Sequence, residues 1–197
     1  MAVQVVRLLV LGAMRLRQPA HGYAVQRLLA DWRIETWTRV RPGSIYHALG
    51  QAEREGRLRL VRSESGDRGP GRTLYELTDA GETEFQRLLE EALTSFDPEE
   101  LGAAVAFMSA LPRARATELL REQHKRATAT ATYLQTLHDH VPPRDEVPHM
   151  PDLLELWRGS VAATADWSAG LIARLEAGEY RMARDRPARR AKSSRSP

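Results

Sequence analysis

The segment that decides the fold runs from His21 to Gly81 and holds three short motifs: HGY at residues 21–23, PGSIYHAL at 42–49 and LYELT at 74–78. In this order they predict two short helices, a third helix with an outward polar face, and a β-hairpin with arginines at its tip. This order is typical of a winged helix-turn-helix, whose usual target is the major groove of duplex DNA.

The third helix has clear local signals at both ends. Pro42 suits the first turn, where the N–H that proline lacks would have no partner, and Gly56 is a natural stop. The apolar residues between them recur three and four positions apart and share one face: Ile45, Ala48, Leu49 and Ala52. Ser44, His47 and Gln51 therefore lie on the opposite face, away from the core.

Two short strands are expected after this helix, joined by a loop from Ser63 to Arg72 that is rich in Gly and contains Pro70. Such a loop predicts a two-stranded wing. The residues expected to point inward are Leu58, Leu60, Leu74 and Leu77. Arg68 and Arg72 flank the tip, where their guanidinium groups could straddle a minor groove or clamp a phosphate. The alternative is that they are exposed loop arginines that keep the protein soluble.

Helices are predicted on both sides of this segment. The apolar run from Val3 to Leu11 is too dense for a surface helix and predicts a buried one. After Thr78 the pattern changes to long helices. The predicted fold class is thus mainly α with a β wing. We expect a winged helix-turn-helix domain over residues 1–80, an α-helical dimerisation and effector domain over 81–180, and a basic disordered tail over 181–197.

The last predicted helix carries an apolar stripe. Its members are Leu153, Trp157, Val161, Thr164, Leu171 and Leu175. Amphipathic helices of this length need a partner surface, and a second copy of the chain is the economical choice. The stripe therefore predicts a homodimer.

Charge is divided unevenly along the chain. Residues 1–77 hold 13 Arg and 7 acidic residues, residues 78–180 hold 9 basic and 18 acidic residues, and residues 181–197 hold 7 basic residues and one acid. A basic amino-terminal part is expected of a phosphate-binding surface. The chain has no cysteine, and its apolar opening run is too short and too charged for a membrane span. These features predict a soluble cytoplasmic protein that makes no membrane contact.

The sequence resembles the PadR-type transcriptional regulators. The resemblance rests on His21–Tyr23, Pro42–Leu49, Glu53–Gly56 and Tyr75–Gly81, and it covers roughly the first half of the chain. It implies a DNA-binding regulator, most simply a repressor that binds a palindromic operator as a homodimer and is released by a small-molecule effector. A winged helix used as a protein-interaction module, without specific DNA binding, is the alternative.

Five residues of the helix-turn-helix are candidates for DNA contact. Ser44 and His47 can reach base edges, and Arg41 suits a phosphate or a guanine edge. Tyr46 can donate its hydroxyl to a phosphate or pack against the second helix. Tyr23 resembles the tyrosine that the family places near the DNA backbone, although an aromatic residue there also suits the core.

Trp157 and Trp167 are candidates for binding a small aromatic effector, since the resemblance implies that some members bind such compounds with their carboxyl-terminal region. Plain helix packing is the competing interpretation.

No arrangement of nucleophile, base and acid appears, so the sequence predicts no enzyme. His138 and His140 diverge on a helix and favour a frayed helix end over a metal site. No cofactor is predicted.

Overall fold

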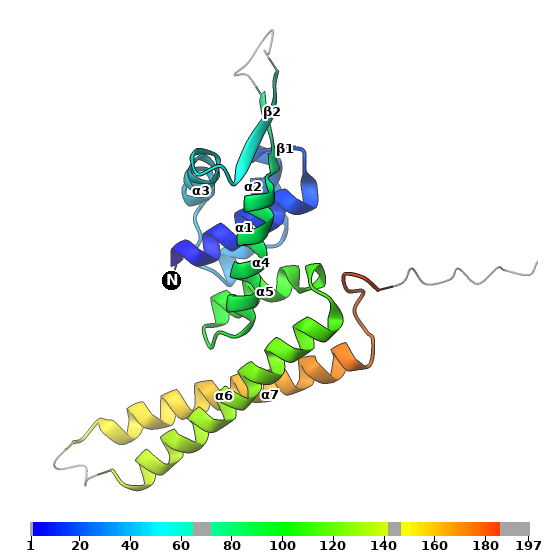
Figure 1. Ribbon diagram of the computed structural model, residues 1–197. Helices are drawn as coiled ribbons and strands as arrows, with labels where there is room; N and C mark the ends of the chain where they lie inside the picture. Colours follow the sequence, from blue (N-terminus) through cyan, green and yellow to red (C-terminus); the bar gives the residue numbers. More distant parts are fainter. Residues whose placement is uncertain (1, 65–71, 142–146, 186–197) are drawn as a thin grey trace, which may run out of the picture.

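The computed structural model describes residues 2–64, 72–141 and 147–185. Figure 1 shows an upper part, formed by the first five helices with a protruding hairpin, and a long pair of helices below it. The elements in chain order are α1 Ala2–Arg17, β1 Ala20–His21, α2 Gly22–Asp31, the short 3-10 turn η1 Ile34–Thr36, α3 Pro42–Arg54, β2 Leu58–Glu64, β3 Arg72–Leu77, α4 Asp79–Leu93, α5 Pro98–Phe107, the 3-10 turn η2 Met108–Ala110, α6 Arg113–Asp139 and α7 Met150–Glu176. The predicted fold class, mainly α with a β wing, is confirmed.

Helix α1 is the centre of the upper part and contacts α2, α3, α4 and α5. Its apolar residues from Val5 to Met14 are buried, and Leu8, Leu9 and Leu11 are at most 1% exposed. Burial of a leucine side chain contributes roughly 1.5–3 kcal/mol. The dense apolar run therefore forms the core on which the two helices of the helix-turn-helix rest.

Helix α3 begins and ends where its local signals predict. Pro42 is its first residue, and Gly56, with a φ of 70°, lies just beyond its end. Its predicted core face is confirmed, because Ile45, Leu49 and Ala52 are buried. The polar face of α3 is thereby turned away from α1.

The wing differs from the prediction in two ways. The sheet has three strands, not two, because β1 pairs with β3 through Ala20 and His21. Leu58 is 2% exposed as expected, but Leu60, which strand alternation placed inward, is 51% exposed. The hairpin projects past the body of the protein in Figure 1, and Leu60 belongs to β2, an edge strand of the sheet. A register shift between Leu60 and Arg62 adds to the departure from regular alternation.

Helices α4 and α5 both begin at a side-chain cap. The Thr78 hydroxyl accepts a hydrogen bond from Gly81 N at 3.1 Å, and an Asp97 carboxylate oxygen accepts one from Glu99 N at 2.8 Å. These caps satisfy amide groups that a helix start otherwise leaves unpaired. They fix where α4 leaves the wing and where α5 turns back beneath α1.

Helices α6 and α7 form the long lower pair in Figure 1, and they cover part of the predicted stripe themselves. Leu171 and Leu175 are 2% and 0% exposed within one chain. The sequence predicts a stripe without cover from its own chain, but α6 supplies that cover at these two positions.

Residues 181–185, which composition assigned to a disordered tail, are anchored to the body. Met182 is 4% exposed, and Ala183 N donates to Ser109 O at 2.9 Å. Arg113 Nη2 lies 2.6 Å from Asp185 Oδ2. The anchored chain therefore extends five residues further than composition predicts.

Within the described ranges, no helix combines the length and apolar character needed to cross a bilayer. The same ranges contain no cluster of three His, Cys, Asp or Glu residues arranged to hold a metal ion.

Candidate nucleic-acid interface

The outward face of α3 presents the predicted reading residues to solvent. Arg41, immediately before the helix, and His47 are exposed, and the Tyr46 side chain is 48% exposed. Ser44 is only half-buried. The structure therefore brings all four residues of this group to the first turns of one helix, on the side that the core leaves free.

Ser44 has a second task that its position at the helix start explains. Its Oγ donates to Arg41 O at 2.6 Å and accepts from Arg41 N at 3.2 Å. A hydroxyl has one hydrogen to donate, so Ser44 can donate to a base only by giving up this contact. Base reading by Ser44 stays a prediction. The side-chain donors of His47 and Arg41 are not tied up in such a helix-start contact.

Tyr46 connects the two helices of the helix-turn-helix. Its hydroxyl donates to Gln26 Oε1 on α2 at 2.9 Å. Tyr46 therefore both contacts α2 and faces solvent: its hydroxyl is hydrogen-bonded to Gln26, while much of its ring is exposed. Tyr23, also on α2, is 64% exposed, which rules out the core position that the sequence left open.

Arg27 is a candidate that the sequence analysis missed. It is exposed and lies one turn after Tyr23 on α2, off the buried stripe of that helix. Among the described residues, neither Arg27 nor Arg41 forms an ion pair. By contrast, Arg59 on the wing is paired with Glu76. The i, i+4 spacing of Tyr23 and Arg27 is the signal that would have identified this position.

A hollow of about 250 Å³ opens beside the first turns of α3. Apolar side chains contribute to its lining, among them Val6, Val40 and Ala48, while Arg41, His47 and the Glu99 carboxylate also line it. Arg41 and His47 therefore lie beside an apolar surface, and an acidic group lies in the same hollow.

The base of the wing is joined to α3 by a polar contact. The Tyr75 hydroxyl donates to Glu53 Oε2 at 3.2 Å, and burial raises the pKa of Tyr75 above its ordinary value. Both residues belong to the motifs quoted above, so the contact gives them a structural role. It holds β3 against the second half of α3.

Arg72 is the first residue of β3, where its backbone pairs with that of Glu64. Arg68 lies outside the described residues. Nearer the body, Leu60 and Val61 of β2 are 51% and 46% exposed. The wing therefore presents apolar side chains that the sequence analysis placed elsewhere or did not consider.

The two predicted effector tryptophans do not share a site. Trp167 is 38% exposed and lines a hollow of about 410 Å³, together with Leu101 and Gly102 of α5. Trp157 does not line this hollow, and it lies ten positions before Trp167 on the same helix, which is roughly 15 Å along the axis. A single small ligand could therefore contact Trp167 here but not both side chains.

The predicted dimerisation stripe is divided between core and surface. Leu171 and Leu175 are buried in their own chain, Leu153, Val161 and Thr164 are half-buried, and Trp157 is 49% exposed. More apolar surface lies toward the far end of the α6–α7 pair. The exposed residues there that the sequence analysis did not single out are Tyr133, Leu137, Met150 and Leu156.

Residues 10–87 match the family described as transcriptional regulator PadR-like. Two solved structures are similar to the chain. Bacillus subtilis PadR in complex with operator DNA is 20% identical, with 87% of this chain and 99% of that chain covered and a TM-score of 0.38. Bacillus subtilis PadR in complex with p-coumaric acid is 19% identical, with 88% and 97% covered and a TM-score of 0.35.

No curated protein matches the chain at a significant level. The segment matched by the family description begins within α1, contains the helix-turn-helix and the wing strands, and ends within α4. It includes every motif on which the resemblance was based. Residues 10–87 of this chain are therefore similar, over the helix-turn-helix and the wing strands, to the PadR-like family of transcriptional regulators.

Proposed function

We propose that this protein is a sequence-specific DNA-binding repressor that acts as a homodimer on a palindromic operator. The observation that carries the proposal is the free polar face of α3, where Arg41 and His47 are exposed. Tyr23 and Arg27 add an aromatic hydroxyl and a cation on the neighbouring helix. Free donors and cations on adjacent helices are what base edges and phosphates require.

In the proposed complex α3 enters the major groove. His47 and Arg41 donate to base edges, and Arg27 with Tyr23 contacts the phosphates on one side. Arg68 and Arg72 of the wing meet the adjacent backbone or minor groove. The excess of arginine in residues 1–77 supports the same orientation, because the acidic segment 78–180 would be repelled by the polyanion.

The dimer is proposed to form through the α6–α7 pair, so that residues 81–180 act as the dimerisation domain. Its exposed apolar side chains, such as Leu156 at 65% and Tyr133 at 62%, are what a second copy would cover. A twofold axis would then place the two α3 helices in successive major grooves, about 34 Å apart. Residues 1–80 would be the DNA-binding domain.

A small aromatic effector is proposed to bind beside Trp167, in the hollow between α5 and α7. A planar ligand there would stack on the indole and press on both helices. If it favours a different spacing of the two α3 helices, it shifts the population away from the DNA-bound state. Release of the repressor is the expected result.

The test is a mobility-shift titration of the intact protein on the DNA upstream of its own gene and on fragments selected from its genome, over a salt series. We expect salt-sensitive, specific binding. His47→Ala should lose roughly 5- to 150-fold in discrimination between operator and scrambled DNA, as the loss of a base contact requires. Arg41→Ala should weaken operator binding. Arg87→Ala on α4 is the control, and it should change neither the discrimination between the two DNAs nor the affinity for the operator.

Two outcomes would contradict the proposal. Equal losses on both DNAs for His47→Ala would remove His47 from base reading. Failure of every genomic fragment to bind would favour the alternative, a winged helix used as a protein-interaction module.

A further inference from the structure

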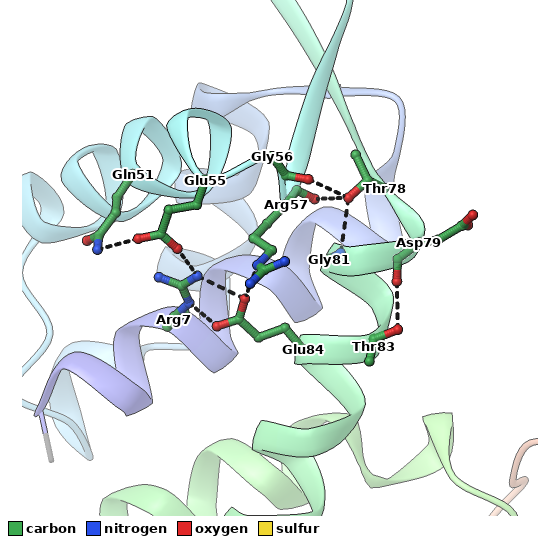
Figure 2. A network of polar contacts seen from close by, with 10 residues as sticks. All are labelled: Arg7, Gln51, Glu55, Gly56, Arg57, Thr78, Asp79, Gly81, Thr83 and Glu84. Carbon is green, nitrogen blue, oxygen red and sulfur yellow. Dashed lines mark hydrogen bonds and ion pairs between the residues drawn. The ribbon is translucent and has the colours of Figure 1, made fainter.

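Four charged side chains meet behind the DNA-facing surface, and we call them the clamp: Arg7, Glu55, Arg57 and Glu84 (Figure 2). They come from separate parts of the chain. Arg7 is on α1, Glu55 caps the carboxyl end of α3, Arg57 precedes β2, and Glu84 is on α4. The clamp therefore connects the recognition helix and the base of the wing to α4 at one point.

Glu84 is the centre of the clamp. It accepts from Arg7 Nη2 at 2.9 Å and also contacts Arg7 Nε, and it lies 2.6 Å from Arg57 Nε. Arg7 reaches Glu55 as well, and Glu55 accepts from Gln51 Nε2 at 2.7 Å. Glu84 and then Glu55 raise the pKa of Arg7, and Arg7 lowers the pKa of Glu55. One arginine thus holds carboxylates from α3 and α4 together.

Hydrogen bonds from Thr78 keep the same elements close. The Thr78 hydroxyl donates to Gly56 O at 2.7 Å (Figure 2), and Thr78 N donates to Arg57 O at 3.1 Å. The residue that caps the start of α4 is therefore bonded directly to the turn that joins α3 to β2.

The clamp restricts orientation more strongly than an apolar contact would. The Arg7 and Glu84 side chains are only 15% and 12% exposed, so water screens their contact little. A guanidinium group is planar and donates to carboxylates in fixed directions, as Arg7 Nη2 does to Glu55 and Glu84, whereas apolar side chains can slide past one another. The contact of Arg57 with Glu84 is an ion pair. Loss of one partner would leave a partly buried charge without compensation.

Helix α4 also contacts α5 and α6, so it lies between the reading elements and the lower helices. We propose that Glu84 is a positioning residue, which sets the orientation of α3 and of the wing base relative to α4 through Arg7 and Arg57. A shift of the lower helices would then reach the DNA-facing surface through α4. This inference rests on the proposed function where it concerns DNA, but the orientation itself can be measured without DNA.

The experiment compares Glu84→Gln with Glu82→Gln in the full-length protein. Glu82 is on the same helix and pairs with Arg15 of α1 at 2.9 Å, so it forms an α1–α4 ion pair without an arm to α3 or to the wing. We expect Glu84→Gln to weaken operator binding roughly tenfold, within the usual range of coupling between sites. The slope of binding against salt should not change, because no phosphate contact is lost. Glu82→Gln should bind like the wild type.

A direct measure of orientation is available because the chain has no cysteine. Spin labels on Arg54→Cys at the end of α3 and Arg87→Cys on α4 report the distance between the two helices. We expect one narrow distribution in the wild type and in Glu82→Gln, and a broadened or displaced one in Glu84→Gln. Glu55→Gln removes only the contact of Arg7 with the end of α3, so it should broaden or displace the distance distribution less. This variant takes the place of Glu84→Gln if the latter folds poorly.

Unchanged distances in folded Glu84→Gln and Glu55→Gln would overturn the proposal, even if DNA binding fell. Equal effects of Glu82→Gln and Glu84→Gln on distance and affinity would also overturn it, since both would then reflect general α1–α4 packing. If the wild type binds no DNA, the proposed function fails, while the distances still decide the role of the clamp.

Discussion

Substitution of Gly81 by alanine tests the joint between the wing and α4. Gly81 lies in the first turn of α4, and a Cβ there would lie 2.7 Å from Leu77 Cδ2 and closer still to Arg57 O. Both are inside the 3.0 Å limit that real Cβ atoms essentially never cross. The carbonyl is backbone and cannot rotate away, so the two segments must separate by roughly 1 Å in a close-packed interior.

The expected cost follows from three contributions. Overpacking costs about 1–3 kcal/mol. Separation also weakens the hydrogen bond from Thr78 N to Arg57 O, which contributes about 1 kcal/mol. The higher helix propensity of alanine stabilises the folded state by about 1 kcal/mol and offsets part of this loss. Gly81→Ala should therefore lose about 2 kcal/mol and lower the Tm by about 4–8 °C for a chain of this size.

Thermal unfolding followed by circular dichroism measures this effect. Gly159→Ala on α7 is the matched control, because no atom lies within 4 Å of its added Cβ. Only the propensity gain remains there, so its Tm should rise by about 2–4 °C. If Gly81→Ala is as stable as the wild type, α4 does not lie against the Arg57 carbonyl and the reasoning fails.

Two further predictions concern assembly and acid stability. Replacement of Leu156 and Trp157 together by glutamate should yield a folded monomer in sedimentation, because both side chains are exposed in the single chain; a dimer of unchanged affinity would place the interface elsewhere. Arg115 holds the pKa of Glu90 below its ordinary value, so this contribution to stability is present above the ordinary glutamate pKa and is lost as pH falls through the lowered one. Urea unfolding over an acid pH series should therefore show a weaker pH dependence in Glu90→Gln, and an unchanged dependence would contradict the assignment.

Features that depend on neighbouring residues were predictable from the sequence. Pro42 and Gly56 mark the ends of α3 because their backbone preferences act locally. The buried face of α3 follows from helical periodicity in the same way. The outward placement of His47 therefore follows from the spacing of the apolar residues around it.

Features that depend on distant parts of the chain were not predictable. The exposure of Leu60 on the edge strand β2 depends on how the sheet packs against the helices, and the local alternation does not show this. The two-residue strand β1 is too short for a pattern to reveal it. Arg7 and Glu84 are 77 residues apart, and nothing in either local sequence indicates that they meet. The capping role of Ser44 depends on the backbone conformation of Arg41, so the sequence indicated only its possible contact with DNA.

Strand β2 lies at one edge of the sheet, and this position has a consequence for solubility. An edge strand with exposed apolar residues is a template on which another polypeptide can add a strand and begin aggregation. Here the register shift between Leu60 and Arg62 falls where Leu60 and Val61 are exposed. A bulge interrupts the regular row of backbone donors and acceptors and twists the edge. The irregularity thus makes this exposed apolar part of β2 a poorer template for an added strand, while the side chains of Leu60 and Val61 stay exposed to solvent.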